Sequence, residues 1–139
     1  MPAADVRPPT MVEQVYPSAD VLPENLLRLY IQFSGPMGLR GGADYVRLVD
    51  AMTRLPRHVF ASSSDVQSCY RDRPVPIGHG QTMSQPYMVA LMTELLELRG
   101  YERVLDIGCG SGYHAALLSL LAREVYAIER IAPLLQGAR

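Results

Sequence analysis

Cysteine is scarce in this chain of 139 residues, in which Cys69 and Cys109 are the two thiols. Two thiols cannot build a disulfide framework or a four-thiolate zinc site, so we expect a reducing compartment and no bound metal. An excess of one charge is also missing, because 13 basic residues face 14 acidic ones, for a formal net charge of −1. This balance disfavours a surface built to bind nucleic acid or an anionic membrane.

Long apolar runs and internal repeats are absent as well. No stretch approaches the roughly 18 apolar residues of a membrane-spanning helix, and the N-terminus lacks the basic-then-apolar plan of a secretory signal. No segment repeats with the period of a solenoid. With 48% hydrophobic and 19% charged residues, the composition is typical of a globular protein. We therefore expect one domain in the cytoplasm, with no membrane partner.

Proline and glycine set the first part of the chain apart from the rest. Residues 1–42 are rich in both, which disfavours long helices and strands there. We expect residues 1–42 to form an N-terminal arm, to which the sequence assigns no role, and residues 43–139 to form the folded domain.

Hydrophobic periodicity predicts two helices in the first part of the folded domain. Apolar residues at positions 45, 48, 49 and 52 indicate an amphipathic helix that ends before Pro56. Residues 70–78 are expected to form an extended loop. Pro86 is suited to open a second helix, which Gly100 would stop. The apolar residues expected on one buried face of this helix are Met88, Leu91, Met92, Leu95 and Leu96.

The last third of the chain alternates strands with helices. Residues 104–107 and 124–128 are predicted strands, and a helix is predicted between them over residues 113–122. This order is typical of a parallel sheet with a right-handed crossover. Pro133 is suited to open a further helix.

Three glycines, Gly108, Gly110 and Gly112, stand between the first of these strands and its helix. Glycine permits a tight turn and lets a ligand approach the backbone, and the N-terminus of the helix offers unpaired N–H groups. Glu129 ends the next strand roughly 20 residues later, a position from which a carboxylate can accept hydrogen bonds from ribose hydroxyls. The pattern predicts a nucleotide-cofactor site, and the alternative is a tight turn without a ligand.

The spacing also distinguishes between cofactors. A dinucleotide fingerprint has its third glycine five residues after the first, where this chain has Tyr113. A phosphate-binding loop is excluded because no Gly-Lys-Ser/Thr follows. Asp106, which precedes the turn, would repel a pyrophosphate but attract a cationic cofactor. S-adenosyl-L-methionine, which carries a sulfonium and an amino group, fits this acid.

Three stretches resemble the protein-L-isoaspartate O-methyltransferase family. Residues 74–96 resemble the signature that precedes the cofactor loop in that family, residues 104–116 resemble its cofactor loop, and residues 125–130 resemble its ribose-binding strand. Within the first stretch, the run Gly-Gln-Thr-x-Ser-Gln-Pro over 80–86 is far more specific than the glycine turn. The resemblance covers about residues 46–139 and leaves the first 42 outside.

The resemblance implies a fold and an activity. The fold is an α/β, doubly wound, Rossmann-like fold of S-adenosylmethionine-dependent methyltransferases, here truncated after the first two strands, so that residues 43–139 form the N-terminal part of the domain. The activity is transfer of a methyl group to the free carboxylate of L-isoaspartyl residues in damaged proteins or peptides, a repair reaction. A carboxylate is ionised at pH 7, so the reaction needs alignment rather than a general base.

The resemblance also assigns roles to residues. Ser84 is implied to be the catalytic residue, whose hydroxyl donates to the substrate carboxylate; its alternative role is to cap the helix that follows. No metal ligand is expected. The expected cofactor-binding residues are Gln81, Thr82, Met83, Ser84, Asp106, Gly108, Gly110, Gly112, Tyr113, Glu129 and Arg130.

Several alternatives stay open at this point. The chain could be a truncated, non-catalytic module that binds the cofactor or serves assembly, and an open sheet edge would favour self-association. His114 either touches the cofactor or faces solvent from the first turn of its helix. Cys109 is expected to be a small buried side chain. Met83, Met88 and Met92 are expected on a helical face in the core.

Overall fold

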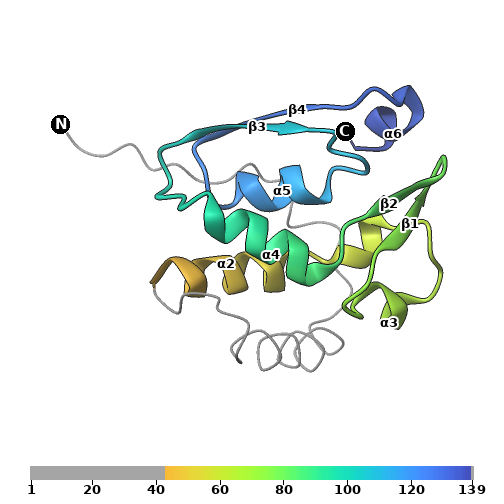
Figure 1. Cartoon of the computed structure of the whole chain (residues 1–139), viewed down its shortest axis with the longest axis horizontal. Coiled ribbons are helices and arrows are strands. Elements are labelled where there is room, and N and C mark those ends of the chain that lie inside the picture. Colours follow the sequence, from red (N-terminus) through yellow and green to blue (C-terminus); the bar gives the residue numbers. More distant parts are fainter. Residues whose placement is uncertain (1–42, 139) are drawn as a thin grey trace.

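The parallel strands, one helix that covers them and a pair of further helices form successive layers (Figure 1). The computed structural model describes residues 43–138, so the predicted N-terminal arm lies outside the described residues. The elements that it describes, in chain order, are α2 (Ala43–Arg54), η2 (Arg57–Phe60), α3 (Val66–Cys69), β1 (Val75–Gly78), β2 (Gln81–Met83), α4 (Pro86–Leu95), β3 (Arg103–Ile107), α5 (Tyr113–Ser119), β4 (Glu124–Ile128) and α6 (Ala132–Gly137).

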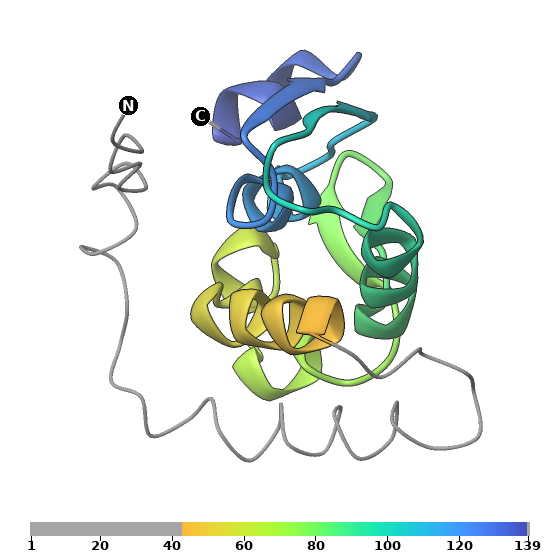
Figure 2. The ribbon, with the colours of Figure 1, turned by 90° about the vertical axis from the view of Figure 1, so that its left-hand side faces the viewer.

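Helix α2 forms where the apolar period predicts it. Leu48 and Met52 are buried on one face, and the helix ends just before Pro56, which disfavours helical geometry in the residue that precedes it. On another face, the Arg47 guanidinium donates to the backbone oxygens of Leu98, at 3.1 Å, and Leu121, at 3.2 Å. These bonds attach α2 to the segments that follow α4 and α5. The two views show α2 and α4 side by side below α5 (Figures 1 and 2).

The buried face of α4 differs from the predicted one. The predicted stripe is partly exposed, because Met88 and Met92 are each more than a third accessible and Leu95 and Leu96 are more exposed still. The helix also ends at Leu95, before the expected residue 99. Its small side chains allow close packing against α2 and α5, so it turns a different side inward. The residues that it buries are Pro86, Val89, Ala90 and Thr93.

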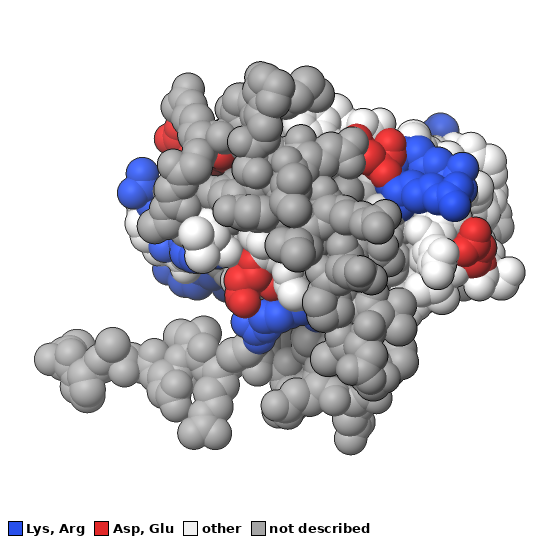
Figure 3. All heavy atoms as spheres, turned by 90° about the horizontal axis from the view of Figure 1, so that it is seen from below, with Lys and Arg blue, Asp and Glu red and all other residues white. Residues whose placement is uncertain are grey.

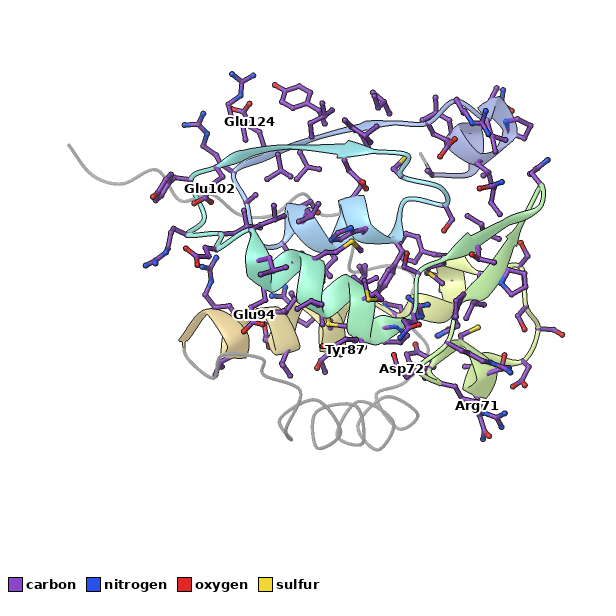
Figure 4. The ribbon with its side chains drawn as sticks, viewed as in Figure 1. Arg71, Asp72, Tyr87, Glu94, Glu102 and Glu124 are labelled. Atoms are coloured by element: carbon purple, nitrogen blue, oxygen red, sulfur yellow. The ribbon has the colours of Figure 1, made fainter. Side chains whose placement is uncertain are left out.

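The start of α4 is capped by a residue distant in sequence. Its N-cap position is Gln85, which forms no side-chain cap bond. Instead, Asp72 Oδ1 accepts the backbone N–H of Tyr87 at 2.9 Å, and Asp72 and Tyr87 lie together at this end of the helix (Figure 4). A carboxylate is favoured at this end because the first N–H groups of a helix have no partner within it.

A β-hairpin replaces much of the loop expected over 70–78. Strands β1 and β2 pair antiparallel, with Val75 opposite Met83 and Pro76 opposite Thr82. The turn between them passes through left-handed conformations at Gly78, His79 and Gly80. Proline disfavours the centre of a sheet, but a two-stranded ribbon consists of edges only, so Pro76 is tolerated. Met83 is buried, as expected, but it lies on this strand and not on a helix.

The predicted strand-helix-strand unit is present. Strands β3 and β4 pair in parallel without a register shift, from Arg103 opposite Glu124 to Ile107 opposite Ile128. Helix α5 connects them and packs on one face of the sheet through Leu117 and Leu118, which are almost fully buried. Figure 1 shows α5 below the sheet and no described element above it. The strand-helix alternation in the sequence therefore predicted this part correctly.

The other face of this two-stranded sheet is apolar and accessible. Four large side chains that alternate along the paired strands are between 51% and 73% exposed, and each strand has one unpaired edge in the described part of the chain. One end of this face is polar, where the Arg103 guanidinium donates to the Glu124 carboxylate at 2.8 Å. We call the apolar part the open sheet face; it consists of Leu105, Ile107, Tyr126 and Ile128.

The described residues contain neither a helix that could span a membrane nor a cluster of metal ligands. None of the helices over 43–138 has both the length and the hydrophobicity needed to cross a bilayer. In the same part of the chain, no three His, Cys, Asp or Glu side chains come together as metal ligands.

Candidate functional site

The glycine turn after β3 requires glycine at each of its three glycine positions. Gly108, Gly110 and Gly112 have φ values of +80°, +58° and +89°, a region that side chains with a Cβ rarely adopt. Gly112 is the N-cap of α5. A Cβ on Gly110 would come within 2.9 Å of Ile77 Cδ1, the end of a flexible side chain that would have to shift, so the positive φ is the main constraint at this position. The turn thus exposes backbone at the N-terminus of α5.

The end of β4 holds this turn in place. The backbone oxygen of Ile128 accepts the N–H groups of Gly108, at 2.8 Å, and of Cys109, at 3.1 Å. Glu129 adds a side-chain link, because its Oε2 accepts the N–H of Gly110 and its Oε1 accepts that of Ile131, both at 2.9 Å. The N–H groups of Ile131 and Gly110 lower the pKa of the Glu129 carboxyl. Glu129 is therefore a carboxylate at neutral pH.

Two hollows adjoin at the turn, since both are lined by Ile107 and Gly108. The first has a volume of about 240 Å³ and lies between the turn, the hairpin and α4. The second has a volume of about 420 Å³ and lies beside the end of β4. Of the predicted site residues, those lining the first hollow are Thr82, Met83, Ser84, Asp106, Gly108, Gly110 and Tyr113. Those lining the second are Gln81, Gly108, Glu129 and Arg130.

The structure thus brings predicted residues from three distant segments to one place. Gly112 lines neither hollow; it is buried beneath the turn as the cap of α5. Residues that the prediction did not include also contribute to the first hollow, among them Ile77 of β1 and Val89 and Met92 of α4. Part of the exposed apolar stripe of α4 is thereby explained: Met92 is exposed because its side chain lines the hollow. The hydrophobic pattern of a sequence does not distinguish an apolar side chain that lines a hollow from one that is buried in the core.

Ser84 lies exposed at the first hollow, directly after β2. Its backbone oxygen accepts a hydrogen bond from Arg57, whereas its hydroxyl has no hydrogen-bond partner among the described residues. The helix-cap alternative does not hold, because Gln85 occupies the N-cap position of α4. The Ser84 hydroxyl is therefore available to a ligand in the hollow.

Arg57 is a supporting residue that the sequence prediction did not single out. Its side chain is 2% exposed, and its Nε donates to the backbone oxygen of Cys69 at 2.8 Å. One Nη donates to the backbone oxygen of Ser84, and the guanidinium carbon lies 5.2 Å from the centre of the Tyr113 ring. Arg57 thus fixes two predicted site residues from below. The only sequence signal was that Arg57 lies within residues 46–139, which the family resemblance covers.

Burial shifts every titratable group that lines the first hollow toward its neutral form. Desolvation raises the pKa of the Asp106 carboxyl, to which the negative charge of Glu129 adds, and the carboxyl Oδ2 is buried without a hydrogen-bond partner. Desolvation also raises the pKa of the Cys109 thiol, raises that of Tyr113 to about 12, and lowers that of His114. An unpartnered carboxyl oxygen at such a place favours a cationic or hydrogen-bond-donating ligand.

A glycine turn between parallel strands, with one acid before it and another after the second strand, defines a nucleotide-cofactor-binding α/β protein. Comparison with known proteins narrows this class. The family model of protein-L-isoaspartate(D-aspartate) O-methyltransferase (PCMT) matches residues 40–139. The chain therefore belongs to the protein-L-isoaspartate O-methyltransferase family, as its sequence motifs indicated.

Curated relatives agree with this assignment. The protein-L-isoaspartate O-methyltransferase of Geobacter metallireducens is 60% identical over 93 residues, which are 67% of this chain and 43% of the relative. That of Myxococcus xanthus is 53% identical over 111 residues, covering 74% of this chain and 52% of the relative. The chain thus spans about half the length of these curated relatives.

Solved structures confirm the predicted fold class. A protein-L-isoaspartate O-methyltransferase aligns with a TM-score of 0.65 at 25% identity, over 83% of this chain and 36% of the other. A Plasmodium falciparum protein of this kind, solved in complex with S-adenosyl-L-homocysteine, aligns with a TM-score of 0.60 at 24% identity, over 82% of this chain and 51% of the other. The described residues therefore adopt the Rossmann-like α/β fold of these methyltransferases.

We predict that Gly112→Ala destabilises the fold. The substitution places a Cβ in a left-handed conformation, 3.0 Å from the Cβ of Ala138, and we expect a loss of about 1–2 kcal/mol in the free energy of unfolding. Denaturant unfolding measures it. Gly137→Ala is the matched control, because that glycine is helical and a Cβ there meets nothing within 4 Å. Equal stability of Gly112→Ala and the unchanged protein would contradict the strain.

Proposed function

We propose that this chain carries the cofactor and substrate site of an S-adenosylmethionine-dependent protein-L-isoaspartate O-methyltransferase. The reaction would methylate the free carboxylate of L-isoaspartyl residues in damaged proteins or peptides, as a step of repair. The observation that carries the proposal is the convergence of the Ser84 segment, the glycine turn and the end of β4 on two adjoining hollows. Family membership and the names of the relatives support the same reaction.

The residues present suit S-adenosyl-L-methionine. The buried, unpartnered Oδ2 of Asp106 is an acceptor for the positively charged amino-acid end. Each oxygen of Glu129 already accepts one N–H, but a carboxylate has about four acceptor positions, so hydrogen bonds from a ribose can be added. The Plasmodium falciparum structural neighbour was solved with S-adenosyl-L-homocysteine, the demethylated form of this cofactor.

For methyl transfer, the protein mainly has to align the substrate carboxylate with the methyl group of the cofactor. When bound, the cofactor supplies an electrophilic methyl group on a sulfonium, and the acceptor carboxylate is already ionised at neutral pH. The Ser84 hydroxyl would donate to one carboxylate oxygen and leave the other directed at the methyl group. Arg57 holds the Ser84 backbone through its carbonyl oxygen, so the position of the hydroxyl depends on a buried contact. No side chain has to remove a proton.

The proposal extends to the partners of the protein, its location in the cell and its domain limits. Isoaspartyl proteins or peptides are the partners, and neither nucleic acid nor a membrane is. On the face shown in Figure 3, acidic side chains lie beside basic ones in the described part of the surface. We place the protein in the cytoplasm, where its two buried cysteines would stay reduced. Residues 1–42 would form an arm separate from the domain of residues 43–139.

A second proposal concerns assembly. The chain spans about half the length of its curated relatives, and the open sheet face leaves four large apolar side chains accessible. Unpaired strand edges and exposed apolar patches favour association. We propose that two copies of this chain associate through this sheet. A module that binds the cofactor and assembles without catalysis is the alternative to the full reaction.

We predict that the folded chain binds S-adenosyl-L-methionine and S-adenosyl-L-homocysteine with measurable heat in calorimetric titrations. Glu129→Gln should weaken both affinities roughly 10–100-fold, because hydrogen bonds to a charged group contribute about 1.5–3 kcal/mol. Glu124→Gln is the matched control, since Glu124 begins β4, the strand that Glu129 follows, and contacts Arg103 at the opposite end. Absence of heat with the unchanged, folded chain would refute cofactor binding.

We predict methyl-ester formation on an isoaspartyl peptide, measured with radiolabelled cofactor. Ser84→Ala should lower kcat/KM roughly 10–100-fold, by loss of one hydrogen bond to the acceptor carboxylate. Ser119→Ala serves as control, because Ser119 is an exposed serine at the end of α5 whose hydroxyl bonds only to the Ala116 oxygen. Cofactor binding without any ester would favour the non-catalytic alternative.

We predict that light scattering gives a mass above the 15.4 kDa of one chain. Leu105→Lys should shift the mass toward that of one chain, because it places a charge on the open sheet face. Leu95→Lys is the matched control, since Leu95 is also an exposed leucine but lies at the end of α4. A single-chain mass for the unchanged protein would contradict association.

A further inference from the structure

His114 occupies the first turn of α5 and lines the first hollow. It does not face open solvent, which was one of the two expectations for this residue. Its Nε2 lies 2.9 Å from the Oγ1 of Thr93, a buried residue of α4. The ring is therefore held between two helices, at the edge of the predicted cofactor site.

The Thr93 hydroxyl determines which ring nitrogen carries the proton. This hydroxyl has a single hydrogen, and it donates that hydrogen to the backbone oxygen of Val89 at 2.7 Å. It must then act as the acceptor toward His114, so Nε2 is the protonated nitrogen. In the neutral ring, Nδ1 is left as a hydrogen-bond acceptor, and it has no hydrogen bond to any described residue.

The hollow holds a second acceptor without a partner. Asp106, from the end of β3, also lines it, and its Oδ2 is buried and unpartnered. The negative charge of Asp106 acts on His114 and opposes the desolvation that keeps the ring neutral. Asp106 and His114 thus line the same hollow from neighbouring elements, and each carries one acceptor atom without a partner among the described residues.

We propose that His114 is a further cofactor-binding residue, whose Nδ1 acts with Asp106 as a paired acceptor for the primary ammonium group of the cofactor's amino-acid end. An ammonium group has three donors and no acceptor, so it needs such a surrounding. The proposal rests on the proposed function, since it assumes that an S-adenosyl amino acid enters this hollow. It makes Thr93 a positioning residue, because Thr93 sets the ring's tautomer.

A pH dependence follows from this arrangement. Protonated His114 would lose its acceptor and repel the ammonium group, so the affinity should fall as the pH drops through the pKa of the ring, which burial places below its ordinary value of 6.5. Tyr113 and Cys109 stay neutral in this range, and nearby Glu129 stays ionised. Asp106, the remaining titratable group of the hollow, has a raised pKa and would weaken binding at lower pH in any variant that keeps it.

Calorimetric titration of the full chain at pH 7.5 and pH 5.5 tests the proposal with two ligands. S-adenosyl-L-homocysteine carries the amino-acid end, and 5′-methylthioadenosine has the same nucleoside thioether without it. For the unchanged protein, we expect the Kd of S-adenosyl-L-homocysteine to be higher at pH 5.5 than at pH 7.5, because more of the His114 ring is protonated at the lower pH. The Kd of 5′-methylthioadenosine should not change with pH.

Two variants identify the residue responsible. His114→Leu should weaken S-adenosyl-L-homocysteine binding at pH 7.5 roughly tenfold, reduce the pH dependence, and leave 5′-methylthioadenosine unaffected. Thr93→Val keeps the shape of the side chain. It should also weaken the binding of S-adenosyl-L-homocysteine and not that of 5′-methylthioadenosine, but by a smaller factor. 5′-Methylthioadenosine reports on whether the site is folded. If His114→Leu loses affinity for both ligands, its site is disrupted. The effect of Thr93→Val on the affinity for S-adenosyl-L-homocysteine then decides whether His114 binds the amino-acid end.

The outcomes separate the two proposals. If the unchanged chain binds neither ligand at either pH, the proposed function fails. If it binds both, but His114→Leu or Thr93→Val retains the affinity for S-adenosyl-L-homocysteine and its full pH dependence, the role of His114 is wrong while the proposed function stands.

Discussion

The arrangement of the site depends on the attachment of the glycine turn to the end of β4. One carbonyl oxygen, that of Ile128, accepts two N–H groups of the turn, and the Glu129 carboxylate accepts a third. These bonds hold backbone that has left-handed geometry and would otherwise be free to move. The same carboxylate faces the second hollow. The group expected to hold the ribose thus also shapes the turn expected to receive the rest of the cofactor.

A buried cation supports the other side of the site. Arg57 joins the chain around Cys69, the carbonyl of Ser84 and the ring of Tyr113. A guanidinium suits this task because its donors are fixed in a plane and can bond in several directions at once. The hairpin segment that carries Ser84 and the helix that follows the turn are therefore tied to one rigid group, although they come from different parts of the chain.

Sequence patterns correctly predicted the elements that form because of their own residues rather than because of distant contacts. The parallel strands, α5 between them and the glycine turn follow from strand periodicity and from glycine's tolerance of positive φ. The buried face of α4 was predicted incorrectly, because Met88 and Met92 are as apolar as core residues and only the packing partners distinguish a hollow from a core. The hairpin was missed because Pro76 argues against a strand, and Arg57 because nothing in a sequence shows that a charge is buried. The family motifs named most residues around the hollows. The sequence left His114 between the cofactor and solvent, and the structure places it in the first hollow beside Thr93.

The cap of α4 has a consequence for the order of folding. The N–H of Tyr87 is bonded by Asp72, a residue 15 positions earlier, so the first turn of the helix lacks a cap until the intervening chain has closed. A helix of ten residues is too short to persist alone in water. We therefore expect α4 and the hairpin before it to form cooperatively, because the loop that joins Asp72 to Tyr87 must close, at a cost in entropy, before the cap can stabilise the helix.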